Sequence, residues 1–384
     1  MTDRNLVVTV FIIILGLSIH STKTEFRVEL VQVLFRHGER VPRQKELLLN
    51  DLHNVSTYEP WGLGQLTNQG KMREYRIGKM LRDRYNKFLG DIYHPSDVYA
   101  YSTDMDRTKM SLQLVLAALY HPSPTQMWNK DLSWMPIPIH YMPEKVDNIM
   151  KPDFSPVYLD ALKTVRKSEE VLNKISVFSD LLKFLSQKTS INITRTSQVY
   201  EIYNLLVAQK SMNLVMPEWC TDDVYKNIQD VVRLEYKIRS YTSLMRRLNG
   251  GALIKRFIDN IKRNEDSATP RKIYLYSGHE TNIAGFVRAH NVTVPDLPMY
   301  GCAIIFEKLS DAAGKHFIRM ILWTGSTEEL IPYKFPGCDE ICPIDKYIEL
   351  VQNVIPSEQE MNHIWDYISK EELCKLYEEK LNPN

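Results

Sequence analysis

A short segment near the amino terminus, Phe35 to Pro42, places basic side chains around one histidine. Arg36 precedes His37 and Arg40 follows three residues later. Guanidinium groups bind phosphate oxygens through paired hydrogen bonds, and positive charge disfavours protonation of a neighbouring imidazole. A ring nitrogen of His37 can therefore stay unprotonated and nucleophilic in acid. Gly38, which has no side chain, is expected to let a ligand approach the backbone closely.

The alternative for this segment is a solvated surface cluster, which is the more frequent setting of a histidine beside arginines. The five fixed positions of Arg-His-Gly-x-Arg-x-Pro favour the chemical interpretation. Average residue usage produces that pattern in roughly one random chain of this length in ten thousand.

A second charged segment spans residues 102–108, with the sequence Ser-Thr-Asp-Met-Asp-Arg-Thr. It follows a predicted strand and opens a predicted helix, so Arg107 is expected to point toward the strand ends and to bind phosphate. The alternative is that Asp104 or Asp106 holds Arg107 locally at the start of the helix.

A third segment, residues 276–282, has the sequence Tyr-Ser-Gly-His-Glu-Thr-Asn and also passes from a strand into a helix. His279 is a candidate ligand for a phosphate oxygen, and Glu280 is a candidate proton donor. A glutamate in the first turn of a helix is also favoured by the helix dipole alone.

Predicted strands and helices alternate on both sides of a central helical stretch. Thr67 is a candidate N-cap for the first helix. The strands are predicted at 28–35, 98–102 and 272–276, a hairpin at 302–309 and 316–323, and helices at 67–85, 106–120 and up to about 290. Because ligands bind at strand ends in open α/β sheets, we expect the three charged segments to share one edge.

This order predicts an α/β fold, with a three-layer α/β/α core, a mixed sheet and an inserted helical cap. The core is assigned to residues 24–150 and 263–384, and the cap insertion to residues 151–262.

The charge balance limits the classes of partner. Lys plus Arg number 48 against 47 Asp plus Glu, so there is no large basic field for nucleic acid or an anionic membrane. Small phosphate monoesters are the expected ligands, and a homodimer stays possible. No cofactor is expected. The cysteines and histidines show no metal-ligand spacing, so no metal is expected either.

The first residues resemble a secretory leader. The apolar run from Leu6 to Ile19 is shorter than the roughly 20 residues that span a bilayer, so a signal peptide over residues 1–23 is favoured over a membrane anchor. No stable membrane anchor is expected, and the mature chain is predicted to be secreted, with the lysosome as an alternative. Three glycosylation sequons fit that compartment; they begin at Asn54, Asn192 and Asn291.

The chain has five cysteines, so at least one has no partner within the chain. Cys338 and Cys342 are separated by three residues and can close a small loop. Disulfides are expected in a secretory compartment.

Together the three charged segments resemble the histidine acid phosphatases, of the prostatic and lysosomal acid phosphatase branch, and most closely the insect venom acid phosphatases. The resemblance runs from about Val28 to the Cys338–Cys342 turn and beyond. The family signature matches residues 36–42, its Asp-Arg-Thr segment residues 106–108, and its late His-acid pair residues 279 and 280.

The resemblance implies a role for each site residue. His37 is the implied nucleophile and Glu280 the implied acid, although the larger branch has aspartate there. The implied phosphate ligands are Arg36, Arg40, Arg107 and His279. Cys338 and Cys342 match a family disulfide, and Cys302 matches half of another. The expected partner of Cys302 is displaced, so Cys220 is assigned to it, and Cys374 has no evident partner.

The predicted function is hydrolysis of phosphate monoesters through a phosphohistidine, with an acidic pH optimum. One alternative is a catalytically silent secreted protein that binds phosphorylated ligands on the same fold. A phosphoglycerate mutase-like role is a second alternative, since those enzymes also use an Arg-His-Gly nucleophile, but a leader and sequons fit poorly with cytosolic chemistry.

Overall fold

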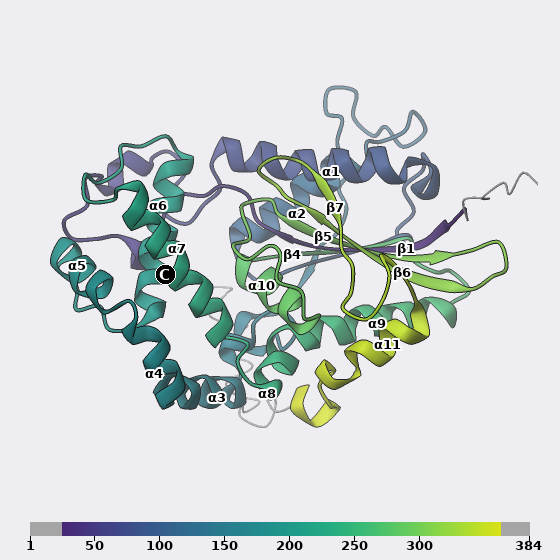
Figure 1. The fold of residues 1–384 in the computed structure, drawn as a ribbon. Helices are drawn as coiled ribbons and strands as arrows, with labels where there is room; N and C mark the ends of the chain where they lie inside the picture. Colours follow the sequence, from purple (N-terminus) through teal and green to yellow (C-terminus); the bar gives the residue numbers. More distant parts are fainter. Residues whose placement is uncertain (1–24, 362–384) are drawn as a thin grey trace, which may run out of the picture.

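The computed structural model describes residues 25–361, which form a mixed β-sheet with helices on both faces and a further group of helices beside it (Figure 1). The strand order is β3-β2-β4-β1-β5-β6-β7, with β8 paired to β6. The strands are β1 (Arg27–Arg36), β2 (Val98–Ser102), β3 (His140–Tyr141), β4 (Ile273–Gly278), β5 (Ala303–Ser310), β6 (His316–Trp323), β7 (Leu330–Pro332) and β8 (Ile341–Pro343).

The directions of the central strands position the site. β1 and β2 both run parallel to β4, whereas β5 is antiparallel to β1. Arg36 pairs with Gly278, and Ser102 pairs with Ser277. The carboxyl ends of β1, β2 and β4 therefore lie together at one edge of the sheet, as the sequence predicts. The predicted hairpin is confirmed as β5 and β6.

Helices cover both faces of the sheet (Figure 1). One face packs against α1 (Asn68–Leu89) and α2 (Asp106–Leu119), through a cluster that joins Leu81 and Leu112 to Val33. The other face packs against α9 (Ala252–Glu265), α10 (Glu280–Ala289) and α11 (Ile344–Val351), through a cluster that joins Phe257 and Phe286 to Leu34. The predicted three-layer α/β/α core with a mixed sheet is confirmed.

A helical segment follows β3 and lies beside the strand ends (Figure 1). It contains α3 (Pro156–Lys167), α4 (Glu169–Ser176), α5 (Ser179–Thr189), α6 (Thr196–Ser211), α7 (Asp222–Ile238) and α8 (Ser243–Arg246). Two apolar clusters hold it together, and one of them also includes Ala284 and Tyr300 of the core. The predicted end of the insertion at residue 262 falls inside α9, whose apolar side chains pack on the sheet, so the division of the chain into segments stays a prediction.

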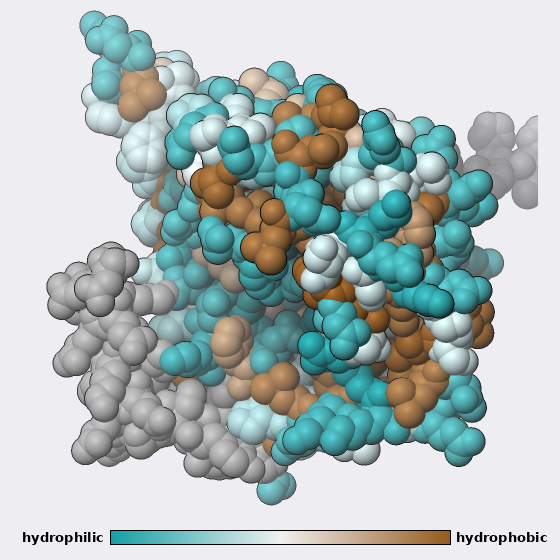
Figure 2. Space-filling view, turned by 90° about the vertical axis from the view of Figure 1, so that its left-hand side faces the viewer, coloured by the Kyte–Doolittle hydropathy of each residue, from teal (hydrophilic) through white to brown (hydrophobic). Residues whose placement is uncertain are grey.

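The outer face of the helical segment carries apolar groups between polar ones (Figure 2). Exposed apolar side chains on this part of the chain include Leu172 and Val177. Polar side chains surround them, as on the solvated surface of an ordinary globular protein.

The missing side chain of Gly38 has a different role from the predicted one, which was close approach of a ligand. A Cβ atom at Gly38 would lie 2.3 Å from the carbonyl oxygen of Gly70, and a Cβ atom at Gly70 would lie 2.1 Å from that of Glu39. The two glycines therefore let α1 pack against the loop that carries His37. Gly70 also donates its N–H to Thr67 Oγ1 over 3.1 Å, which makes Thr67 the N-cap of α1 as predicted.

Cys338 and Cys342 form a disulfide. Cys220 and Cys302 are both free, so the assignment of a disulfide between them is wrong. They pack in different places: Cys302 is buried in the cluster under the sheet, and Cys220 lies against the cluster of the helical segment. Cys374 lies outside the described residues.

The leader predicted at residues 1–23 also lies outside the described residues. Within residues 25–361, none of the helices combines the length and apolar character that a bilayer span requires. Asn54, Asn192 and Asn291 are all exposed, which is compatible with the three sequons.

Candidate active site

All six predicted site residues lie at the shared edge of β1, β2 and β4. Arg36 ends β1, Arg107 stands in the first turn of α2, and Glu280 begins α10. The six side chains belong to almost fully buried residues, so their charges act with little screening by water. The exposed fractions are 4% for Arg36, 1% for His37, 2% for Arg40, 8% for Arg107, 7% for His279 and 6% for Glu280.

The ring of His37 is oriented by its own loop. Its Nδ1 lies 2.8 Å from the carbonyl oxygen of Gly38, and because a carbonyl only accepts, Nδ1 is the donor. The lone pair of the neutral ring is therefore on Nε2. Burial, and then the positive charges of Arg107 and Arg36, hold the pKa of His37 well below its ordinary value. An unprotonated ring nitrogen in this position is the form that can act as a nucleophile.

Arg36 is fixed on three sides. It donates from Nη1 to the carbonyl oxygen of Pro298 over 2.7 Å, and its Nε lies 3.1 Å from Oε2 of Glu280. Its guanidinium carbon lies 4.1 Å from the ring centre of Tyr300, which is a cation–π contact. The Tyr300 ring is also 5.8 Å from that of His37. No motif pointed to Tyr300.

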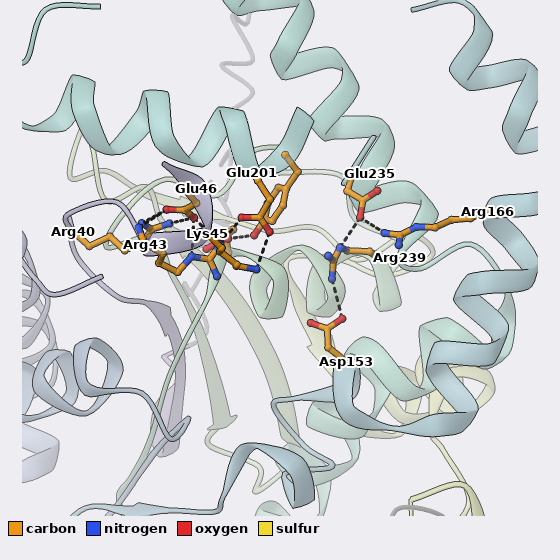
Figure 3. A network of polar contacts seen from close by, with 11 residues as sticks. Arg40, Arg43, Lys45, Glu46, Asp153, Arg166, Glu201, Glu235 and Arg239 are labelled. Atoms are coloured by element: carbon orange, nitrogen blue, oxygen red, sulfur yellow. Dashed lines mark hydrogen bonds and ion pairs between the residues drawn. The ribbon is translucent and has the colours of Figure 1, made fainter. Parts of the chain in front are cut away.

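Arg40 is held by a carboxylate that sequence reasoning missed. Its two terminal nitrogens each donate to one oxygen of Glu46 over 2.7 Å, which is the bidentate geometry that fixes a guanidinium most firmly. Glu46 also accepts from Arg43, and Arg43 and Lys45 both contact Glu201 on α6 (Figure 3). The network connects the loop after His37 to the helical segment.

Arg107 and His279 complete the cluster. Burial, and then the positive charges of Arg40 and Arg43, lower the pKa of Arg107 to about 10, so it stays charged at acid pH. His279 Nε2 lies 3.0 Å from the hydroxyl oxygen of Thr103, which joins the second and third charged segments. The ring centres of His279 and His37 are 5.5 Å apart.

Glu280 is the one acidic group among the six residues. Burial alone would raise its pKa, but the positive charge of Arg36 and a hydrogen bond donated by the hydroxyl of Tyr200 hold the pKa well below its ordinary value. Glu280 is therefore ionised while the site is empty.

These side chains can hold an anion beside a nucleophile. Three guanidiniums against the two carboxylates of Glu280 and Glu46 leave an excess of positive charge around His37 Nε2, and a phosphate group would neutralise it. Among the described residues, no group of three or more His, Cys, Asp or Glu side chains is arranged to hold a metal ion.

A sequence model of the histidine phosphatase superfamily (branch 2) matches residues 27–322. The chain belongs to this superfamily. The matched range includes all three charged segments and every residue of the cluster described above.

The relatives of this histidine phosphatase support its assignment to the superfamily. It is 40% identical over 338 residues to the venom acid phosphatase Acph-1 of Apis mellifera, covering 86% of each chain. It is 31% identical over 355 residues to the prostatic acid phosphatase of Rattus norvegicus, covering 91% of this chain and 92% of the relative. The solved structure of Hafnia alvei phytase shares the fold with a TM-score of 0.66 at 17% identity, covering 86% of this chain and 97% of that one.

The histidine phosphatase also contains a buried carboxyl group behind its site, Glu74 of α1, which is fully buried. Burial, and then the carboxylate of Glu39, raise its pKa well above the ordinary value of 4.5, whereas Arg73 and Arg36 act in the opposite direction. A raised pKa in the folded state contributes stability below the unfolded value and loses it as pH rises through the folded value.

We therefore expect Glu74→Gln to raise the melting temperature at pH 7.5 by about 2 °C or more, since the amide needs no proton. At pH 4, where Glu74 is neutral in the folded protein, the variant and the wild type should melt within about 1 °C of each other. Thermal unfolding at the two pH values measures the difference. A variant that melts below the wild type at pH 7.5 would show that an ionised Glu74 is stabilising.

Proposed function

We propose that this histidine phosphatase hydrolyses phosphate monoesters through a phosphohistidine at His37. The phosphate group is held by Arg36, Arg40, Arg107 and His279, and Glu280 donates a proton to the leaving alcohol. The observation that carries the proposal is the position of the unprotonated His37 Nε2 within a cluster of three guanidiniums. The relatives named acid phosphatase support it.

The first step transfers the phosphoryl group to the enzyme. The Nε2 lone pair of His37 forms a bond to phosphorus, the ester P–O bond breaks, and the departing oxygen receives a proton from Glu280. In the second step a water oxygen bonds to phosphorus, the P–N bond breaks and Glu280 takes the proton of that water. The arginines stabilise the charge on the transferred group throughout.

The proton on Glu280 must arrive with the substrate, because the carboxylate is ionised in the empty site. A bound phosphate group brings negative charge next to Arg36 and so raises the pKa of Glu280. A phosphate monoester whose second pKa is about 6 enters as a monoanion in acid and carries one proton with it. Activity should therefore fall as pH rises above about 6.

An assay with an aryl phosphate at acid pH tests the proposal. Because arginines supply the positive charge that magnesium provides in other phosphoryl-transfer enzymes, excess EDTA should leave the rate unchanged. Loss of activity that a divalent ion restores would overturn the metal-free mechanism. A protein that binds phosphate without releasing it from the ester would be the silent binding protein, and phosphoryl transfer to a second alcohol without inorganic phosphate would indicate the mutase-like role.

We also propose that the chain is a secreted glycoprotein. The predicted leader and the three exposed sequons support this, as does the similarity to a venom enzyme. Expression in insect cells should place the protein in the medium, and removal of N-linked glycans should reduce its mass. Retention of an unglycosylated chain inside the cells would refute secretion.

A further inference from the structure

The two carboxylate oxygens of Glu280 are held by different parts of the molecule. Oε2 lies 3.1 Å from Nε of Arg36, at the end of β1. Oε1 accepts a hydrogen bond from the hydroxyl of Tyr200, which belongs to α6 of the helical segment. Tyr200 is only 6% exposed, so water has little access to replace its hydroxyl.

Tyr200 is itself held in place from outside the site. Its ring packs edge-on against Tyr236, with ring centres 6.0 Å apart, and the guanidinium carbon of Arg239 lies 5.6 Å from its ring centre. Arg239 is paired with Asp153 and Glu235 (Figure 3). The direction of the Tyr200 hydroxyl is therefore set by the packing of the helical segment.

A proton donor must lie within hydrogen-bond reach of the leaving oxygen. A glutamate has more rotatable bonds than an aspartate, and each one leaves the carboxyl group more positions to occupy. We propose that Tyr200 is a positioning residue that directs the Glu280 carboxyl toward the leaving oxygen. The helical segment thus supplies the side chain that holds the proton donor of the core in place. This inference rests on the proposed function.

The role has a consequence for the pH profile. Tyr200 donates to the ionised form of Glu280, so removal of its hydroxyl should increase the proton affinity of that carboxyl. At saturating substrate the phosphorylation rate depends on the proton held within the enzyme–substrate complex, so the alkaline limb of that rate should then move to higher pH, even though the maximum rate falls.

The test is Tyr200→Phe, which keeps the packed ring. With an alkyl phosphate in single turnover, the phosphorylation rate should fall about tenfold to a hundredfold, as for other hydrogen bonds to a charged group, with little change in substrate affinity. The matched control is Tyr241→Phe in the same helical segment, where the hydroxyl accepts from Nζ of Lys174 and from no residue of the site. It should keep the wild-type rate and pH profile.

A double-mutant cycle tells whether Tyr200 acts through the position of the Glu280 carboxyl or through a general loss of structure. Glu280→Asp withdraws the carboxyl group by about 1.5 Å, the length of one C–C bond, and so breaks its contact with Tyr200. In that background Tyr200→Phe should change the rate by less than about twofold. The inference would be overturned if the effects of the two substitutions on the rate were additive, or if the alkaline limb of the Tyr200→Phe rate profile did not move. In both cases the wild-type enzyme would still be active. A wild-type protein with no turnover would instead refute the proposed function.

Discussion

His37→Ala is expected to abolish turnover, with a fall of more than about a thousandfold in kcat for every phosphate monoester. The variant lacks the ring nitrogen that we propose forms the covalent intermediate. An alkaline quench with labelled substrate should find phosphate on His37 in the wild type and none in the variant. Acid quench would miss the adduct, because phosphohistidine is labile in acid.

His37→Asn controls for the loss of packing, because an amide can still donate to the carbonyl oxygen of Gly38. It should be as inactive as His37→Ala and should melt closer to the wild type. Both variants should still bind inorganic phosphate, since the arginines remain. An active wild type whose quenched protein carries no label on His37 would contradict the covalent mechanism.

Glu280→Gln is expected to reduce the phosphorylation rate of an alkyl phosphate by about a hundredfold to ten-thousandfold. An alkoxide needs a proton to leave, and an amide cannot supply one. An activated aryl phosphate leaves as a stable anion, so its phosphorylation rate should fall far less. Single-turnover measurement with the two substrates gives the comparison.

The same variant removes the negative charge paired with Arg36, so phosphate binding should be at least as tight as in the wild type. A parallel loss for both leaving groups, together with weaker substrate binding, would show that Glu280 only positions the site. The donor would then be sought at Asp104, which pairs with Lys109, or at Asp106, which accepts from Gln65.

Much of the fold follows from local patterns in the sequence. Apolar runs of strand length that end in charged residues identify β1, β2 and β4, and their parallel order follows from the intervening helices. Because parallel strands end at the same edge, Arg36, Arg107 and His279 could be brought together before any coordinates were known. Each of these residues stands in a recognisable motif.

Residues that act through long-range packing carry no such signal. Tyr200 and Tyr300 reach the site from α6 and from the turn before β5, and nothing in their neighbouring sequence marks them. The pairing of Cys220 with Cys302, which was assigned from the family resemblance, failed because the sequence does not tell which cluster each cysteine joins. Gly38 was correctly singled out for its missing side chain, but the group that comes close is the backbone of Gly70 rather than a ligand.

The central position of β1 affects how the chain must be made. This strand is among the first described residues to leave the ribosome, yet its two neighbours, β4 and β5, follow the entire helical segment. At about 5–20 residues per second, roughly 15 to 55 seconds separate the emergence of β1 from that of β5. Until β4 emerges, the largely apolar segment from Leu30 to Phe35, which is fully buried in the finished protein, has neither of its neighbouring strands to pair with. We therefore expect the nascent chain to expose an unpaired, aggregation-prone strand while the helical segment is being made.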